Sequence, residues 1–156
     1  MTTHDETTAL APMEGLHLAR DPAESLAEAS KAAAVLVRMV KEQGLSCRFG
    51  GEKEHLFFEA WETIAAWYGV SYGVDSVETI PGEAAPVGFR AHAYAETGNG
   101  RRYEATASCW TDEPNWRSKP LFQLESMAQT RAMGKVLRSA LGWVAVLAGY
   151  SGTPGE

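Results

Sequence analysis

The sequence predicts an α+β domain: an antiparallel three-stranded β-meander, a short β-hairpin, and a long C-terminal helix packed on the sheet. Segments with apolar residues at helical spacing occur before, between and after the predicted strands. The central segments instead alternate in polarity and are rich in β-branched and aromatic residues, as strands are. Their connections are short, which favours antiparallel pairing of neighbouring strands. The expected order is helix, two short strands, helix, three strands, helix.

The first predicted helix covers residues 23–43. Asp21 followed by Pro22 is typical of a helix start, because aspartate caps the first amides and proline suits the first helical turn. Gly44 is typical of a helix end. Residues 1–20 are polar and lack periodicity, so we expect a flexible arm there. The predicted domain therefore covers residues 21–150, and residues 151–156 are expected to form a tail.

Two short strands, residues 45–49 and 55–57, are predicted to form a hairpin around Gly50 and Gly51. Residues 58–68 follow as a second helix, in which aromatic and aliphatic residues recur at intervals of three and four. Gly69 is expected to end this helix, so that the chain turns into the sheet.

Three longer strands are predicted at residues 70–80, 87–96 and 101–110. Residues 97–100, Thr-Gly-Asn-Gly, have strong turn chemistry, so we expect a tight turn between the second and third of these strands. After a loop at 111–120, a long helix is expected from Leu121 to about Ala140. The apolar segment 141–150 either continues that helix after a kink at Gly142 or packs as a separate short helix.

The charge of the chain is unevenly distributed. The formal net charge is −6, which argues mildly against a nucleic-acid binder, since such proteins are usually basic. Residues 100–140, however, contain seven basic and four acidic residues, whereas the rest contains seven basic and sixteen acidic ones. This asymmetry is typical of a chain with a binding region and a solvating region, and chance clustering is the alternative.

Cysteine usage and hydropathy predict the compartment. Cys47 and Cys109 are far apart and match no zinc-ligand spacing, so free thiols in a reducing compartment are the simplest interpretation. The first residues lack the apolar segment of a secretion signal, and no apolar run reaches the ~20 residues needed to cross a bilayer. We therefore expect a cytoplasmic protein.

Three cations on the last long helix form the sharpest candidate site. Arg131, Lys135 and Arg138 are spaced so that they fall within roughly 60° of one another around a helix. Apolar residues occupy the other side, which is expected to face the sheet. Like charges on adjacent turns repel one another, a pattern that makes sense if a polyanion lies along the stripe. A solvated polar face of an ordinary amphipathic helix is the alternative.

Aromatic and basic residues also alternate around the third long strand and the loop after it. Unpaired bases stack on aromatic side chains while basic groups follow the backbone of a single strand. Tyr103 and Trp116 are therefore candidate base-stacking residues, although Tyr103 and Trp110 also suit positions at the core. Further candidates for contact with the DNA backbone are Arg101, Arg102, Arg117 and Lys119.

Signatures of catalysis are missing from the sequence. The segment Gly50-Gly51-Glu52-Lys53 does not match a phosphate-binding loop, and the motifs of common hydrolases, zinc proteases and kinases do not occur. The four histidines are scattered along the sequence. We therefore expect a protein that is not an enzyme and that uses neither a cofactor nor a metal.

The run from Gln129 to Gly142, QTRAMGKVLRSALG, resembles the long basic helix that follows the β-meander in Rad-fifty-two-type single-strand annealing proteins. The segment from Phe49 to Trp61 resembles the hairpin and helix that precede the meander in this family. Phage and bacterial annealases of the Sak and Erf kinds share the layout. The resemblance covers about residues 30–150, and the acidic net charge departs from the usually basic family pattern.

The resemblance implies ATP-independent annealing of complementary single strands in homologous recombination and repair. It implies subunits that assemble into rings or helical arcs, with the strand in a groove between hairpin and meander. A single-strand-binding protein or a recombinase is a further expected partner. By position, DNA contacts are implied for Arg131, Lys135 and Arg138 on the helix, for Arg48 and Lys53 on the hairpin, and for Arg101, Arg102 and Arg117 at the meander edge.

Two other functions fit the same elements. One is a structural oligomer, in which acids of a neighbouring subunit pair with the three helix cations. The other is a small-molecule-binding or enzymatic domain with a pocket between helix and curved sheet. The annealing hypothesis requires that the protein's own carboxylates leave the helix cations available. The pocket of the small-molecule hypothesis would be lined by Trp61, Tyr68, Phe89, His92 and Tyr94.

Overall fold

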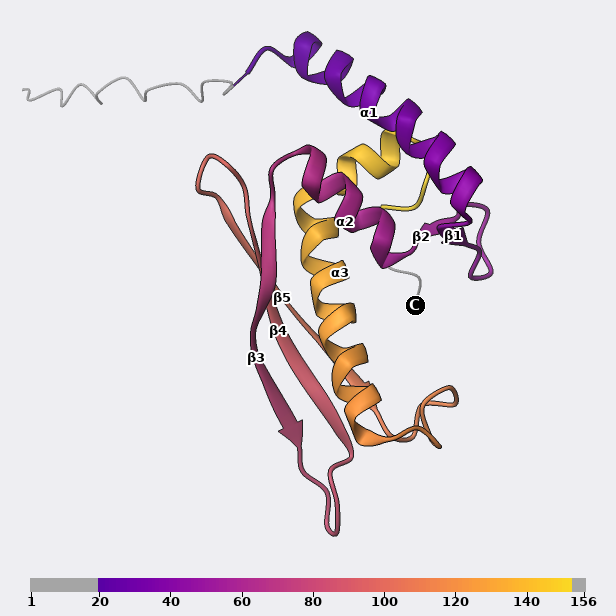
Figure 1. Ribbon diagram of the computed structural model, residues 1–156, viewed down its shortest axis with the longest axis vertical. Coiled ribbons are helices and arrows are strands. Elements are labelled where there is room, and N and C mark those ends of the chain that lie inside the picture. Colours follow the sequence, from indigo (N-terminus) through magenta and orange to yellow (C-terminus); the bar gives the residue numbers. More distant parts are fainter. Residues whose placement is uncertain (1–19, 153–156) are drawn as a thin grey trace, which may run out of the picture.

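The computed structural model describes residues 20–152, which form an α+β fold of the predicted order (Figure 1). Most of the predicted arm, residues 1–19, and the end of the predicted tail, residues 153–156, lie outside the described residues. The elements are α1 (Pro22–Gln43), β1 (Ser46–Cys47), β2 (His55–Leu56), α2 (Phe58–Trp67), β3 (Ser71–Ile80), β4 (Gly88–Glu96), β5 (Arg102–Trp110) and α3 (Leu121–Leu147).

Capping residues determine where α1 begins and ends. The side chain of Asp21 accepts hydrogen bonds from the amides of Ala23 and Glu24 at 2.7 and 3.1 Å. Gly44 adopts the left-handed conformation at φ 66°, and its amide donates to the carbonyl of Val40. α1 then packs against α2 and α3.

The hairpin is shorter than predicted, because β1 and β2 pair over only two residues each. The amide of Phe57 also donates to the carbonyl of Leu45 at 2.9 Å, which extends the contact by one bond. The Ser46 hydroxyl donates to the Glu54 carboxylate at 2.6 Å and joins the two arms. Between the strands the chain turns at Gly50, whose φ of 69° favours glycine.

The sheet has the order β3-β4-β5 with antiparallel pairing throughout, which confirms the predicted meander. β4 pairs with β5 from Gly88 opposite Trp110 to Glu96 opposite Arg102. β3 pairs with the other side of β4, with an irregularity between Val74 and Ser76. β5 is therefore an edge strand, and half of its backbone groups have no partner within the sheet.

α3 runs along the sheet as a single helix that continues through Gly142 to Leu147. The segment 141–147 therefore continues the long helix and does not form a separate short one. Its last turns, drawn in yellow, lie next to α1 and α2 (Figure 1). No helix within residues 20–152 is long and apolar enough to span a bilayer.

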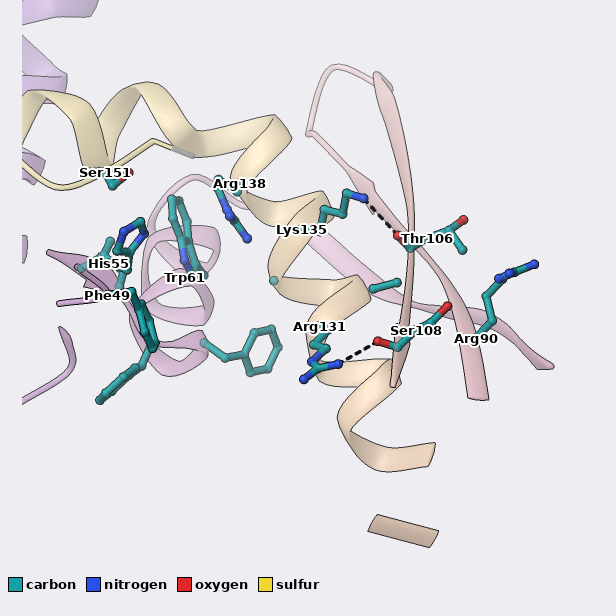
Figure 2. Close-up of a pocket in the computed structure, with 15 residues that line it drawn as sticks. Phe49, His55, Trp61, Arg90, Thr106, Ser108, Arg131, Lys135, Arg138 and Ser151 are labelled. Atoms are coloured by element: carbon teal, nitrogen blue, oxygen red, sulfur yellow. Dashed lines mark hydrogen bonds between the residues drawn. The ribbon is translucent and has the colours of Figure 1, made fainter. Parts of the chain in front are cut away.

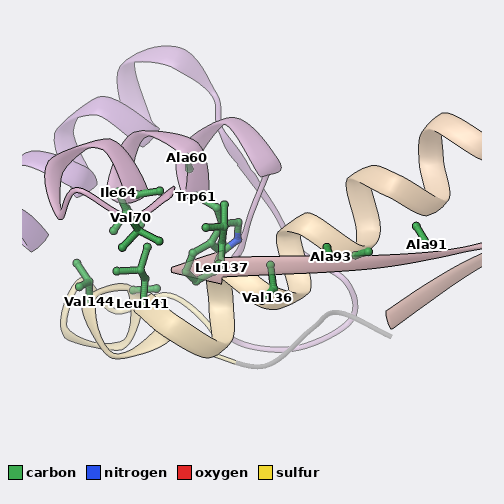
Figure 3. Packing of buried hydrophobic residues seen from close by; sticks show 14 of the residues in the cluster. Ala60, Trp61, Ile64, Val70, Ala91, Ala93, Val136, Leu137, Leu141 and Val144 are labelled. Carbon is green, nitrogen blue, oxygen red and sulfur yellow. The ribbon is translucent and has the colours of Figure 1, made fainter. Parts of the chain in front are cut away.

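Small residues allow α3 to lie close to the sheet. Ala91, Ala93 and Ala95 of β4 are fully buried and face the helix, where Ala128 and Ala132 are also fully buried. Larger apolar side chains fill the space between α2 and the C-terminal half of α3 (Figure 3), including Ile64, Leu137, Leu141 and Val144. Because this packing determines the rotation of α3, it directs Arg131 and Lys135 toward the edge of β5. Arg138, one turn further along, lies beside Trp61.

Candidate functional site

A groove of about 910 Å³ lies along the polar stripe of α3 (Figure 2). Arg131, Gly134, Lys135 and Arg138 of α3 form its floor. One wall comes from the hairpin and α2, and the other from residues 106–108 of β5. The structure thus brings the three predicted helix cations into one cavity, between the hairpin and the meander.

The lining of the groove is basic. Arg90 of β4 also borders the groove, but it alternates with buried Phe89 and Ala91, so its side chain extends from the face of the sheet opposite α3. None of the described residues that line the groove is acidic. Figure 2 shows Arg90 extending beyond β5 and away from α3, so it lies at the outer rim. Arg90 is not among the contacts predicted from the sequence. The alternation of β4, with buried Ala91 beside exposed Arg90, was the available signal.

Arg131 is neutralised within the protein. Its Nη1 and Nη2 atoms donate to the two carboxylate oxygens of Glu113 at 2.7 and 2.6 Å, and Nη1 also donates to the Ser108 carbonyl at 2.8 Å. This pairing raises the pKa of Arg131 and lowers that of Glu113. Glu113 also accepts the amide of Trp110 at 2.8 Å. The expectation that all three helix cations are free of the protein's own carboxylates is therefore wrong for Arg131.

Lys135 keeps its charge uncompensated. Its Nζ atom donates to the carbonyl of Thr106 at 3.2 Å, and the side chain is exposed. None of the ion pairs in residues 20–152 involves Lys135. A single hydrogen bond to a neutral carbonyl leaves two ammonium donors of this lysine available to a ligand.

Arg138 is the most unusual of the three. Its Nε atom is buried and has no hydrogen-bond partner among the described residues, and its Cζ atom lies 5.9 Å from the ring centroid of Trp61. Burial lowers the pKa of this guanidinium. A buried N–H of a charged group without an acceptor is costly.

The helix cations also cover the open edge of β5. Arg131 donates to the carbonyl of Ser108, and Lys135 donates to that of Thr106. These carbonyls are two residues apart, so they point to the same side of the strand, away from β4. The two side chains therefore occupy backbone groups that would otherwise be available to another strand.

The predicted hairpin cations do not line the groove. Arg48 lies 3.5 Å from the carboxylate of Glu54, and Lys53 is exposed in the turn between β1 and β2. The hairpin and the residues that follow it contribute mainly aromatic rings instead, from Phe49, His55 and Phe57.

The predicted cations of the meander lie outside the groove as well. Arg102 donates to Asp75, Glu96 and Glu104 at 2.6, 2.8 and 2.9 Å, which raises its pKa above the usual value. Its guanidinium also lies 4.4 Å from the Tyr94 ring centroid. Tyr94 alternates with buried Ala93 and Ala95, so this network occupies the face of the sheet opposite α3.

The remaining predicted contacts are also away from the groove. Arg117 donates to the Asp112 carbonyl at 3.3 Å, and Lys119 is exposed at the end of the same loop. Arg101 lies over the ring of Tyr103, 5.0 Å from its centroid. Tyr103 and Trp116 are partly buried against the core, so neither predicted base-stacking residue lies where the helix cations are.

One group of side chains on the sheet has the composition of a metal site. Its potential ligand atoms lie within 4.8 Å of one another and come from Asp75, His92 and Glu104. The scattered positions of the histidines in the sequence did not indicate this proximity. The guanidinium of Arg102 donates to both carboxylates, so a cation already occupies this group.

The five residues proposed for a small-molecule pocket do not gather around the groove either. Trp61 alone among them is part of its lining.

Comparison with protein-family models gives no match for this chain, and comparison with curated proteins gives none either.

Proposed function

We propose that this protein binds single-stranded DNA in the α3 groove and anneals complementary strands without ATP, as a non-enzymatic cytoplasmic protein of recombination or repair. The observation that carries the proposal is the basic lining of the groove, which has no acidic residue among its described members, in a chain of net charge −6. Phosphates bind such cation clusters through the release of counterions. The resemblance of residues 129–142 to Rad-fifty-two-type annealing proteins supports the same function.

Lys135 and Arg138 supply the charge that a DNA backbone would meet. Arg131 is compensated by Glu113, and Arg90 lies at the rim. Arg138 lines the groove and takes part in none of the ion pairs of residues 20–152, so its guanidinium charge is not compensated by a carboxylate there. We therefore assign the main phosphate contacts to these two residues.

The length of the stripe limits what one subunit holds. From Arg131 to Arg138 a helix rises about 10 Å. Phosphates of a stacked strand are about 3.4 Å apart along the axis, so one groove holds about three nucleotides. Because a pairing of about three bases is too short to persist, the proposal includes a homo-oligomer, as a ring or helical arc, whose grooves lie in series. A single-strand-binding protein or a recombinase is proposed as a further partner.

Salt-dependent binding tests the site. Fluorescence anisotropy with labelled oligo(dT) is expected to show affinity that falls with salt. The double variant Lys135→Ala/Arg138→Ala is expected to bind more weakly. The negative slope of its log K against log[salt] is expected to be less steep by about 1.4, since each lost contact to a single strand removes about 0.7.

The matched control is Arg101→Ala/Lys119→Ala, which removes two exposed cations outside the groove. Its slope is expected to equal that of the wild type. An equal loss in both double variants would mean that net charge, rather than the groove, attracts DNA, and the proposed site would be rejected.

Annealing itself is measured by fluorescence quenching with two complementary labelled strands in the absence of nucleotide. The wild type is expected to accelerate pairing, and the Lys135→Ala/Arg138→Ala variant to lose that acceleration. Native mass spectrometry with and without the oligonucleotide reports the oligomer. Equal annealing rates with and without protein would contradict the proposed activity.

A further inference from the structure

The two sides of the groove differ in chemistry. Cations lie on the α3 floor, and the β5 wall consists of backbone and small side chains at residues 106–108. The opposite wall is aromatic and apolar, with Phe49, Phe57 and Phe58 among its members. A ligand that fits both sides has an anionic edge and an apolar, flat edge.

Two rings of the aromatic wall are exposed in a way that a core position does not explain. The side chain of Phe49 is 61% exposed and that of Phe57 is 39% exposed. Phe49 contacts the ring of His55 at 5.6 Å between centroids, in a tilted arrangement that supports the ring without burying it. Trp61, in contrast, is only 3% exposed, so its faces are occupied by the protein.

We propose that Phe49 and Phe57 form a base-contacting wall, so that an unpaired strand lies in the groove with its phosphates toward Lys135 and Arg138 and its bases against these rings. This inference rests on the proposed function and deepens it, because it assigns the base contacts to the hairpin region rather than to Tyr103 and Trp116. Single-stranded nucleic acid has the two required edges: a charged backbone and bases whose π-faces stack on aromatic rings.

Duplex DNA fits the groove poorly, because its base faces are covered by neighbouring base pairs and only its grooves and backbone are accessible. Stacking on Phe49 covers one face of a base and leaves its hydrogen-bonding edge open. Base contact of this kind is therefore compatible with pairing to an incoming complementary strand.

The experiment compares two probes of equal length, oligo(dT) and an abasic deoxyribose-phosphate oligonucleotide, in anisotropy titrations with the full chain. Phe49→Ala is expected to weaken oligo(dT) binding about fivefold or more, the effect typical of one lost base stack. The same variant is expected to bind the abasic probe as the wild type does. Its salt slope is expected to be unchanged, because no charge is removed.

Phe122→Ala is the matched control, since Phe122 is 64% exposed on α3 and outside the groove. It is expected to bind both probes as the wild type does. Phe57→Ala serves as the second test of the wall and is expected to show the same selectivity for the probe with bases. Circular dichroism of each variant confirms that the helices are retained.

The inference is overturned if Phe49→Ala and Phe57→Ala bind oligo(dT) as tightly as the wild type, or if they lose equal affinity for both probes. Failure of the proposed function looks different, because the wild type itself would then show no salt-dependent binding to oligo(dT). The two failures are thus separated by the first titration.

Discussion

Arg131 and Glu113 form a two-bond ion pair that joins α3 to the loop after β5, with N–O distances of 2.7 and 2.6 Å. The loop carboxylate is held from a second direction by the Trp110 amide, and the guanidinium also binds the Ser108 carbonyl. Arg131 therefore acts as a positioning residue. It joins the β5 wall of the groove to the α3 floor, and the proposed phosphate contacts are made by Lys135 and Arg138 instead.

The first prediction concerns stability. Glu113→Ala leaves the partly buried guanidinium without its carboxylate and removes the acceptor for the Trp110 amide. Hydrogen bonds to charged groups contribute about 1.5–3 kcal/mol, so we expect the free energy of unfolding in urea to fall by about 2 kcal/mol. Glu83→Ala, at an exposed acid between β3 and β4, is the control and is expected to change it by less than about 0.5 kcal/mol. Equal losses of unfolding free energy in the two variants would show that the ion pair between Arg131 and Glu113 does not stabilise the fold.

The second prediction concerns pH. The hydrogen bonds from Arg131 are the main reason why the pKa of Glu113 lies below the usual value of 4.5. The unfolded chain therefore takes up this proton at a higher pH than the folded one, and folding is favoured by the pair at pH values above about 4.5. As the pH falls from there through the folded-state pKa, this contribution is lost. The difference in unfolding free energy between wild type and Glu113→Gln is expected to be constant near neutrality and to shrink below pH 4.5. A difference that is constant down to pH 3 would contradict this linkage.

The third prediction concerns the charge of the groove. Glu113→Gln keeps an acceptor beside Arg131 but removes the negative charge that compensates it. The floor of the groove should therefore attract phosphates more strongly. We expect oligo(dT) to bind about two- to fivefold more tightly at low salt, which is the effect of one charge several ångströms away in a solvent-exposed site. Anisotropy at several salt concentrations measures it, and the gain should disappear at high salt. Weaker binding by Glu113→Gln would mean that Arg131 must be held by a full carboxylate for the groove to keep its shape.

Local signals in the sequence were sufficient for the fold. These signals act through residues that are near one another in the sequence, and each element that they predicted is present. They include the helix caps Asp21 and Gly44, the turn at 97–100 and the alternation of β4. The hairpin was overestimated in length, because its strands have only each other as partners and the glycine turn takes up the residues between them.

The site was only partly predictable, because partners distant in sequence determine it. Helical spacing was enough to place Arg131, Lys135 and Arg138 on one stripe. No spacing rule indicates that Glu113, 18 residues earlier, neutralises the first of them. The exposure of Phe49 likewise depends on how the hairpin meets α2 and α3. Arg102 is a predicted DNA contact, but three acids on three strands surround it in the structure.

The last prediction concerns Gly134, which lies in the groove floor at the middle of α3. A Cβ atom at this position would lie 3.7 Å from Cδ2 of Phe58, an ordinary contact, and glycine within a helix costs about 1 kcal/mol relative to alanine. Gly134→Ala is therefore expected to raise the unfolding free energy by about 0.5–1 kcal/mol. Gly142→Ala is the matched control outside the groove, since its Cβ would also meet its nearest neighbour at 3.7 Å, and a similar gain is expected.

The two glycines should differ in binding, because only Gly134 borders the space that the strand would occupy. Gly134→Leu, with a side chain that projects into the groove between Arg131 and Arg138, is expected to weaken oligo(dT) binding at least tenfold while circular dichroism shows the helix intact. Gly142→Ala is expected to bind as the wild type does. Unchanged affinity of a folded Gly134→Leu variant would show that DNA, if it binds, does not enter this groove, since the added side chain and the strand would need the same volume.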